Sequence, residues 1–303
     1  MNFRWKKRLI VFLLTGLLLF ALSSCRHSKV EIVTIKGSDT EVNLVQELAE
    51  QFMENDADIS LTITGGGSGY GIASLINQKT DIANSSRPLN TKEKQLIEKQ
   101  GLKVYPVIFA QDAIAVVVHP QTKITELSLD DVGKIFRGEI KNWKELGGED
   151  IVISLYGRQS NSGTFVYFRE RILKGEYDSS IRQMNGTAQL IEAVKQDIGG
   201  IGYVGIGYLL NKKDEVASTI TAVKLRENDK TSVSPLDKEA IIDGRYPIIR
   251  PLFQFLNGKP QGKSLEFLRY ELSYEGQKIV AQSGYFEINK QQQEQNNALG
   301  VGL

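Results

Sequence analysis

The sequence predicts an α/β protein with two lobes, each built around a mostly parallel sheet flanked by helices. Strand-like runs rich in β-branched residues alternate along the chain with amphipathic segments of helical period. That alternation is typical of parallel sheets whose faces are covered by helices. A valine-rich run interrupts the pattern, which then restarts. We therefore expect the chain to leave one lobe, build a second and return.

The first unit is a strand at residues 30–35 followed by a helix over residues 44–52. Ser38, Asp39 and Thr40 stand between them, and all three are good N-cap residues. The same order of strand, turn and helix recurs three times along the chain. The second unit has a strand at 59–64, a turn at 65–67 and a helix from Ser68, and the third has a strand at 82–84, an exit at 85–87 and a helix over 91–99. The fourth has a strand at 151–156, a loop at 157–161 and a helix from Ser162.

The buried strand at residues 113–120 and the extended run at 246–256 mark the expected crossings between the lobes. Thr187 is expected to cap a further helix, and two more helices are expected at 264–272 and 275–282. The polar end of the chain has little to bury and is expected to fray. The predicted division is a signal peptide at 1–24, a tether at 25–29, a first lobe at 30–112 with 246–289, a second lobe at 113–245 and a polar tail at 290–303.

The N-terminus has the pattern of an export signal. A basic stretch precedes the 14-residue apolar run from Leu9 to Leu22, which is too short for a membrane span of about 20 residues. The following "LSSC" resembles the lipobox of bacterial lipoproteins, which implies cleavage before Cys25 and acylation of its thiol. We expect an exported protein anchored by lipid to the membrane of the cell envelope, on its periplasmic or outer-surface side; an unmodified free thiol is the alternative.

Composition excludes several classes of site. Cys25 is the only cysteine, so the chain has no intramolecular disulfide and no thiolate metal cluster. Without residues 1–24 the chain keeps 33 basic and 36 acidic residues, a net charge of −3. That balance argues against a nucleic-acid partner. We expect a monomer.

Hydroxyl side chains gather where the predicted strands end and helices begin. Ligands of open α/β sheets lie at such exits, and helix N-termini favour anions. A single hydroxyl there is explained by capping alone. Four exits carry one or more hydroxyls, and two of these have a neighbouring arginine, which indicates an anion site; the residues are Ser38 with Thr40, Ser68, Ser86 with Arg87, and Ser162 with Thr164 near Arg158.

Arg158 and Gly163 strengthen this interpretation. A guanidinium is a planar fork that binds tetrahedral oxyanions through two bonds. Gly163 has no side chain to block a close approach to its N–H. The alternative for Arg158 is a surface ion pair with an acidic residue. The alternative for the glycines at 65–71 is a tight turn that holds no ligand.

Nucleotide and enzyme sites lack their required residues. A P-loop needs a Lys-Ser/Thr pair where Tyr70, Gly71 and Ile72 stand. A GxGxxG match at residues 200–205 lacks the acidic partner of dinucleotide sites. His27 lies in the tether and His119 precedes Pro120 at a strand end, so we expect neither histidine to lie near the serine-rich turns. We expect no metal, no cofactor and no catalytic residue.

Six motifs together resemble the periplasmic phosphate-binding proteins of ABC importers. The likeness covers roughly residues 32–285 and follows the order GSDT (37–40), GGGSGYGI (65–72), DIANSSRPL (81–89), GEIKNWKEL (138–146), GRQSNSGT (157–164) and GIGYVGIGY (200–208). The resemblance implies a two-lobed periplasmic-binding-protein fold of type II that passes phosphate to an ABC permease. It also implies that the anion is held between the lobes by Ser38, Thr40, Ser68, Arg158, Ser162, Gly163 and Thr164.

The sequence departs from the family pattern at one position. Some members place an aspartate after the third strand to accept the proton of hydrogen phosphate, whereas this chain has Ser86, followed by Arg87. Asp39 or Asp112 could accept that proton, and so could the Ser86 oxygen. A deprotonated oxyanion such as sulfate is therefore an alternative ligand. A surface phosphate sensor or adhesin without a transport role, and a metal-free phosphotransferase, are alternative functions.

Overall fold

The structure is a computed structural model that describes residues 30–302 except residues 57 and 211–218. Eleven strands lie in the described part of the chain: β1 Glu31–Gly37, β2 Ile59–Thr64, β3 Ile82–Ser85, β4 Val104–Val118, β5 Glu126–Ser128, β6 Ser154–Arg158, β7 Arg182–Met184, β8 Gly200–Gly205, β9 Thr221–Ala222, β10 Lys224–Arg226 and β11 Ile249–Asn257.

Helices alternate with these strands over most of the chain. The α-helices of the described residues are α2 Val42–Asn55, α3 Ser68–Ile76, α4 Thr91–Lys99, α5 Leu129–Phe136, α6 Gly163–Phe168, α7 Thr187–Gln196, α8 Gly207–Leu210, α10 Lys238–Ile242, α11 Gly262–Leu272, α12 Tyr274–Gln282 and α13 Lys290–Ala298. Short 3₁₀ turns lie at Pro120–Thr122 and Trp143–Leu146, and a π-helical turn at Arg169–Leu173 extends α6. No helix in the described ranges combines the length and apolar character that a membrane crossing requires.

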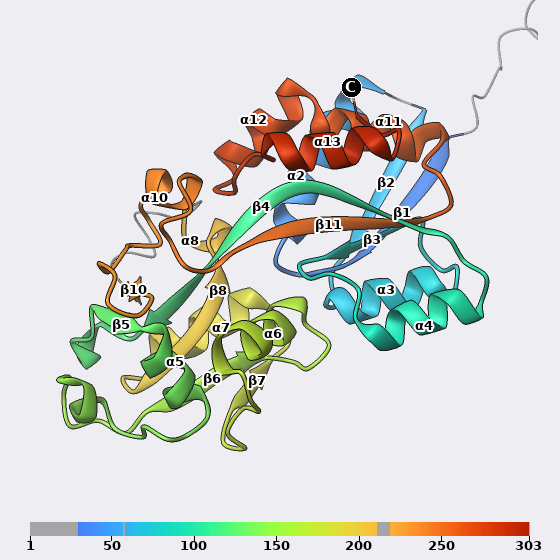
Figure 1. The fold of residues 1–303 in the computed structure, drawn as a ribbon. Coiled ribbons are helices and arrows are strands. Elements are labelled where there is room, and N and C mark those ends of the chain that lie inside the picture. Colours follow the sequence, from blue (N-terminus) through green and yellow to red (C-terminus); the bar gives the residue numbers. More distant parts are fainter. Residues whose placement is uncertain (1–29, 57, 211–218, 303) are drawn as a thin grey trace, which may run out of the picture.

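One curled sheet runs through the molecule in the order β2-β1-β3-β11-β4-β8-β6-β7, with β9 also paired to β4. At one end β1 is parallel to β2 and β3, and at the other end β6 is parallel to β7 and β8. Between these ends β11 is antiparallel to both β3 and β4. The long pair β4 and β11 therefore joins two α/β lobes, as Figure 1 shows.

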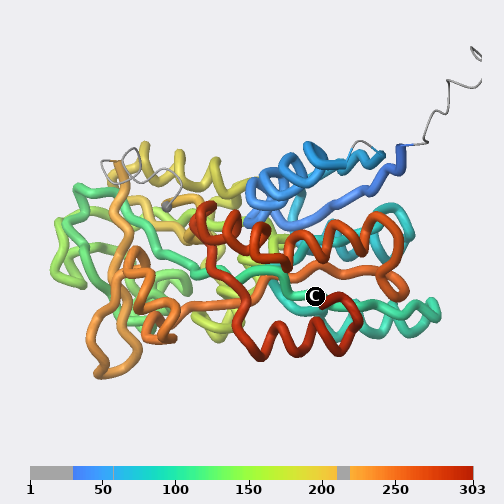
Figure 2. Tube along the Cα trace, turned by 90° about the horizontal axis from the view of Figure 1, so that it is seen from above, coloured from blue at the N-terminus to red at the C-terminus, as the bar shows by residue number. Residues whose placement is uncertain are grey.

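Two large hydrophobic cores correspond to the two lobes, and a smaller cluster around Ile72, Leu75 and Ile97 lies beside α3 and α4. The first contains residues from Val33 to Ala110 and again from Leu252 onward, and the second contains residues from Ala113 to Ile248 together with Phe286. Seen from above, the blue N-terminal and red C-terminal segments share one half of the molecule, and the yellow and light green segments fill the other (Figure 2). The expected two-lobed α/β fold is therefore confirmed, and the lobe bounds at residues 112 and 246 stay predictions.

The polar tail was expected to fray, and this expectation is wrong. Residues Lys290–Ala298 form α13, which begins with a capping box between Asn289 and Gln292. The buried Asn296 donates to the Ile108 carbonyl at 2.7 Å and accepts from the Ile108 N–H at 3.1 Å. The helix is attached by the Asn296 amide, which pairs with the backbone of β4, and by Ile288, Leu299 and Val301, which pack on the core of the first lobe.

Two expected helix caps are also corrected. Helix α2 has Glu41 at its N-cap position and no side-chain cap, so Ser38, Asp39 and Thr40 do not cap it. Thr187 is the first residue of α7 rather than its cap. By contrast, Ser162 caps α6 as expected, because its hydroxyl accepts the Phe165 N–H. The hydroxyls of Thr40 and Thr187 accept hydrogen bonds from Arg250 and Arg158 instead, and Ser38 interacts with the Glu41 carboxyl.

Candidate functional site

The hydroxyls of Thr40 and Thr164 meet between the lobes. Thr40 follows β1 in the first lobe, and Thr164 lies in the first turn of α6 in the second lobe. Their Oγ1 atoms are 2.7 Å apart, and both side chains are buried. Two strand exits that are 124 residues apart in sequence therefore place hydroxyls at a single point.

Ser68, Ser86 and Gly163 form a second cross-lobe contact. The Ser68 hydroxyl accepts the Ser86 N–H at 3.1 Å, and the two Oγ atoms are 3.4 Å apart. A Cβ added to Gly163 would lie 2.3 Å from Ser68 Oγ and 2.5 Å from Ser86 Oγ. Such distances are shorter than real Cβ contacts, so only glycine allows the start of α6 to approach these serines. The N–H groups of Gly163 and Thr164 make no hydrogen bond with another described residue.

Arg250 connects these hydroxyls to Asp112. Its guanidinium donates to Asp112 Oδ2 at 2.8 and 3.0 Å, and the pair is almost completely buried. The same group donates to Thr164 Oγ1 at 3.0 Å and to Thr40 Oγ1 at 3.4 Å, and it reaches the Ser86 carbonyl at 3.2 Å. Burial raises the pKa of Asp112, and the Arg250 guanidinium opposes that shift. A buried cation therefore lies at the meeting point of three strand exits.

Arg158 makes a second ion pair that crosses between the lobes. Its Nη2 lies 2.6 Å from Asp39 Oδ2, and its Nη1 donates to Thr187 Oγ1 at 2.7 Å. The other Asp39 oxygen accepts the Gly66 N–H at 2.8 Å. The two arginines and two aspartates balance one another, so a dianion entering here would meet hydroxyl and N–H donors without a surplus of negative charge.

The glycine-rich turn after β2 lies against the second lobe. Gly66 and Gly67 have φ of +124° and +93°, which side chains rarely adopt. Asn161 of the second lobe donates its side-chain amide to the Gly66 carbonyl at 2.9 Å and accepts the Gly69 N–H through its own carbonyl at 2.9 Å. The glycines therefore allow the backbones of the two lobes to touch.

Comparison with known proteins supports the same interpretation. The family model described as "PBP superfamily domain" matches residues 26–275. The phosphate-binding protein PstS of Borreliella burgdorferi is 30% identical over 290 residues, which cover 92% of this chain and 98% of that protein. This chain belongs to the PstS family of the PBP superfamily. PstS of Bacillus subtilis is 32% identical over 257 residues, covering 84% of this chain and 80% of that protein.

A solved structure agrees with this assignment. A substrate-binding protein assigned to a phosphate ABC transporter of Clostridium perfringens, solved with bound phosphate, superposes with a TM-score of 0.75 at 28% identity. The match covers 86% of this chain and all of that one. The type II binding-protein fold that the sequence predicts is confirmed for this PstS-family chain.

Several of the predicted site residues lie together, whereas the two predicted arginines, Arg158 and Arg87, pair with acidic side chains instead. Thr40, Thr164 and Ser86 contact Arg250, and Ser68 and Gly163 lie against Ser86. Ser38 and Ser162 are buried, and Arg158 binds Asp39. Arg87 turns away, because its guanidinium makes two bonds to Glu93, at 2.7 and 2.8 Å. Glu93 is the third residue of α4 and leaves no free fork on Arg87 for an anion.

Arg250 is the residue that sequence reasoning missed. It lies near the start of β11, within the extended apolar run that predicts a strand, and its partner Asp112 is 138 residues away. The two are direct partners in the antiparallel register of β11 and β4. An arginine inside an apolar strand is a signal, because an unpaired charge is almost never fully buried. The sequence alone does not reveal which strand supplies its partner.

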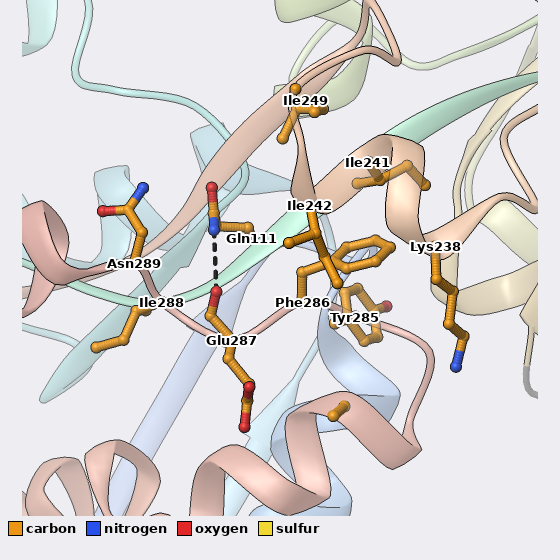
Figure 3. A pocket seen from close by; sticks show the side chains of 12 residues that line it. Gln111, Lys238, Ile241, Ile242, Ile249, Tyr285, Phe286, Glu287, Ile288 and Asn289 are labelled. Atoms are coloured by element: carbon orange, nitrogen blue, oxygen red, sulfur yellow. Dashed lines mark hydrogen bonds between the residues drawn. The ribbon is translucent and has the colours of Figure 1, made fainter. Parts of the chain in front are cut away.

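Other predicted features lie outside this cluster. The described residues contain no group of three or more His, Cys, Asp and Glu side chains able to hold a metal ion. His119 accepts the Gln121 N–H at the end of β4. The signal peptide, Cys25 and His27 lie outside the described residues. A cavity of about 490 Å³, shown in Figure 3, lies on the far side of Tyr285, between α10 and the segment after α12.

Proposed function

We propose that this protein is an extracytoplasmic solute-binding protein that captures inorganic phosphate between its two lobes and delivers it to an ABC permease. One observation carries the proposal: hydroxyls of both lobes, Thr40 and Thr164, share the buried Arg250 guanidinium. Hydroxyls, free N–H groups and an arginine are the donors that a tetrahedral oxyanion requires. The printed names of the relatives, phosphate-binding protein PstS, agree with this ligand.

Asp112 is the better candidate for the proton acceptor that favours hydrogen phosphate over sulfate. Its carboxyl contacts Arg250, which in turn contacts both threonines, whereas Asp39 contacts Gly66 and Arg158. A carboxylate accepts up to about four hydrogen bonds, so Asp112 can accept one more from the acidic proton of the anion. Sulfate has no such proton at neutral pH and would face an unpaired acceptor.

The remaining features of the proposal concern the whole protein. Lipid on Cys25 would hold it at the membrane, since each buried methylene contributes about 0.8 kcal/mol. We propose that it acts as a monomer and as a binder rather than an enzyme, because an esterase would need a nucleophile with a positioned base. The ion pair between Arg158 and Asp39 would then stabilise the closed form.

Isothermal titration with phosphate, arsenate and sulfate tests the proposal. We expect phosphate and arsenate to bind with micromolar affinity or better, about 8 kcal/mol, and sulfate to bind more weakly. Asp112→Asn should narrow the difference between phosphate and sulfate. Arg250→Lys should weaken the binding of every oxyanion, because an ammonium cannot keep the two bonds to Asp112 and also contact Thr40 and Thr164. The exposed Arg269→Lys is the control, and a protein that binds no oxyanion at all contradicts the proposal.

A further inference from the structure

A group of buried oxygen atoms beside the anion site has no hydrogen-bond donor among the described residues. Five such atoms are Oε1 and Oε2 of Glu41, Oε2 of Glu271, Oε1 of Gln254 and Oδ1 of Asn84. These four side chains are at most 2% exposed. Buried polar atoms are normally paired with protein groups or with water, so five acceptors without a protein donor call for carboxyl protons or buried water as donors.

These side chains are neighbours. Asn84 on β3 and Gln254 on β11 are direct partners in the antiparallel register, so they share a face of the sheet. Gln254 donates its amide to Glu271 Oε1 on α11 at 3.1 Å. The Glu41 carboxyl lies close enough to Glu271 for the two charges to interact. Two acids and two amides therefore form one buried polar cluster, which we call the Glu41–Glu271 cluster.

Protons on the two acids supply the missing donors. A proton on Glu41 and one on Glu271 turn two of the five acceptors into donors, and each donor can serve one of the remaining oxygens. Two protons thus account for four of the five atoms. The Ser38 hydroxyl interacts with the Glu41 carboxyl and is available as a donor to the fifth oxygen atom. No hydrogen bond of normal geometry joins Ser38 to Glu41.

The charges around Glu41 favour the same protonation state. Burial raises the pKa of Glu41 well above its usual range, Arg250 on β11 opposes this, and Asp112 on β4 and Glu271 on α11 add to it. Tyr285, which follows α12, also interacts with the Glu41 carboxyl. Arg250 is already paired with Asp112, so it is not free to balance a second carboxylate.

Glu41 is next in sequence to Thr40, and both interact with Arg250. We propose that Glu41 keeps its proton in the folded protein and that anion binding between the lobes depends on that proton. The first half of the proposal, the proton on Glu41, stands on the Glu41–Glu271 cluster alone. The second half, the dependence of anion binding on that proton, rests on the phosphate function proposed above. An ionised Glu41 would place another negative charge next to the anion in a buried site, where charges are weakly screened.

The proton itself is tested in the unmodified protein. The chemical shift of the side-chain carboxyl carbon in selectively labelled glutamate distinguishes acid from carboxylate, and Glu41→Gln assigns the signal. We expect Glu41 to be the neutral acid at pH 7, and Glu50 is a glutamate that lies exposed on the same helix, α2. Glu50→Gln is the control variant. An ionised Glu41 signal at pH 7 overturns the first half of the proposal, whether or not any anion binds.

The dependence is tested by adding phosphate. Because linkage is reciprocal, bound phosphate must raise the pH at which Glu41 loses its proton. Calorimetry should give Glu41→Gln a phosphate Kd within about threefold of the natural protein at pH 7, because glutamine is also neutral. As Glu41 ionises, the natural protein should lose up to about tenfold in affinity per pH unit relative to this variant. If phosphate leaves the midpoint of the Glu41 titration unchanged, anion binding does not depend on the Glu41 proton and the second half of the proposal is overturned.

Two further outcomes distinguish the proton on Glu41 from a bound cation and from the phosphate function. If Na⁺ or Ca²⁺ raises the Tm of the natural protein and not that of Glu41→Gln, the cluster holds a cation and the proton is excluded. If phosphate fails to bind while Glu41 is still the neutral acid, the phosphate function fails and the first half of the proposal stands.

Discussion

Gly163→Ala is the sharpest perturbation of the contact between the lobes. The new Cβ would lie 2.3 Å from Ser68 Oγ and 2.5 Å from Ser86 Oγ, so either these two hydroxyls or the start of α6 must move. Overpacking of this kind costs about 1–3 kcal/mol. Ser68 and Ser86 belong to the other lobe, so the new Cβ no longer overlaps their hydroxyls when the lobes separate. The substitution therefore raises the free energy of the closed form and not that of the open form.

The measured quantity is the phosphate Kd, by isothermal titration. A cost of about 1–3 kcal/mol corresponds to a loss of about 5-fold to about 150-fold in affinity. Gly186→Ala is the matched control, because a Cβ there meets nothing within 4 Å in the same lobe. A Gly163→Ala protein with a Kd within twofold of the natural value refutes the reasoning, because the lobes would then not close on Gly163.

Three other predictions concern ionic groups. In a double-mutant cycle, Arg158→Ala and Asp39→Ala should show a coupling of about 1–3 kcal/mol in the free energy of phosphate binding, and additive losses would contradict an ion pair between the lobes. Arg87→Gln should lower the Tm, because it breaks the ion pair with Glu93, and should leave the phosphate Kd within about twofold of the natural value. A large loss of phosphate affinity would show that Arg87 does contact the anion. Burial raises the pKa of Glu271 well above its usual range, so the folded state keeps a proton that the unfolded state releases. The free energy of unfolding should therefore fall by up to about 1.4 kcal/mol per pH unit above about pH 4.5 on its account, and Glu271→Gln should remove that part of the slope in urea titrations.

The sequence predicts most of the elements because their signals are local. Helix α4 has the predicted bounds, Thr91–Lys99, since Asn90 and Glu93 form a capping box at its start. The turn at Gly65–Gly67 lies between β2 and α3 as expected. The hydroxyls gather at one edge because parallel strands end there, which strand order alone predicts.

What the sequence does not reveal depends on pairing between distant segments. Arg250 enters the site only because the returning strand β11 aligns it with Asp112 on β4. Arg87 leaves the site because Glu93, six residues later, offers a closer partner. Helix α13 has too few apolar residues to give a helical hydrophobic pattern in the sequence. Asn296 attaches it through hydrogen bonds to the backbone of Ile108.

A crystal structure of the protein grown with phosphate tests the central claim most directly. The account predicts one tetrahedral anion between the lobes, within hydrogen-bonding distance of Thr40 and Thr164, of Ser68, and of the Arg250 guanidinium. Closed lobes with no anion density at that point, or phosphate bound only on the outer surface, would contradict it.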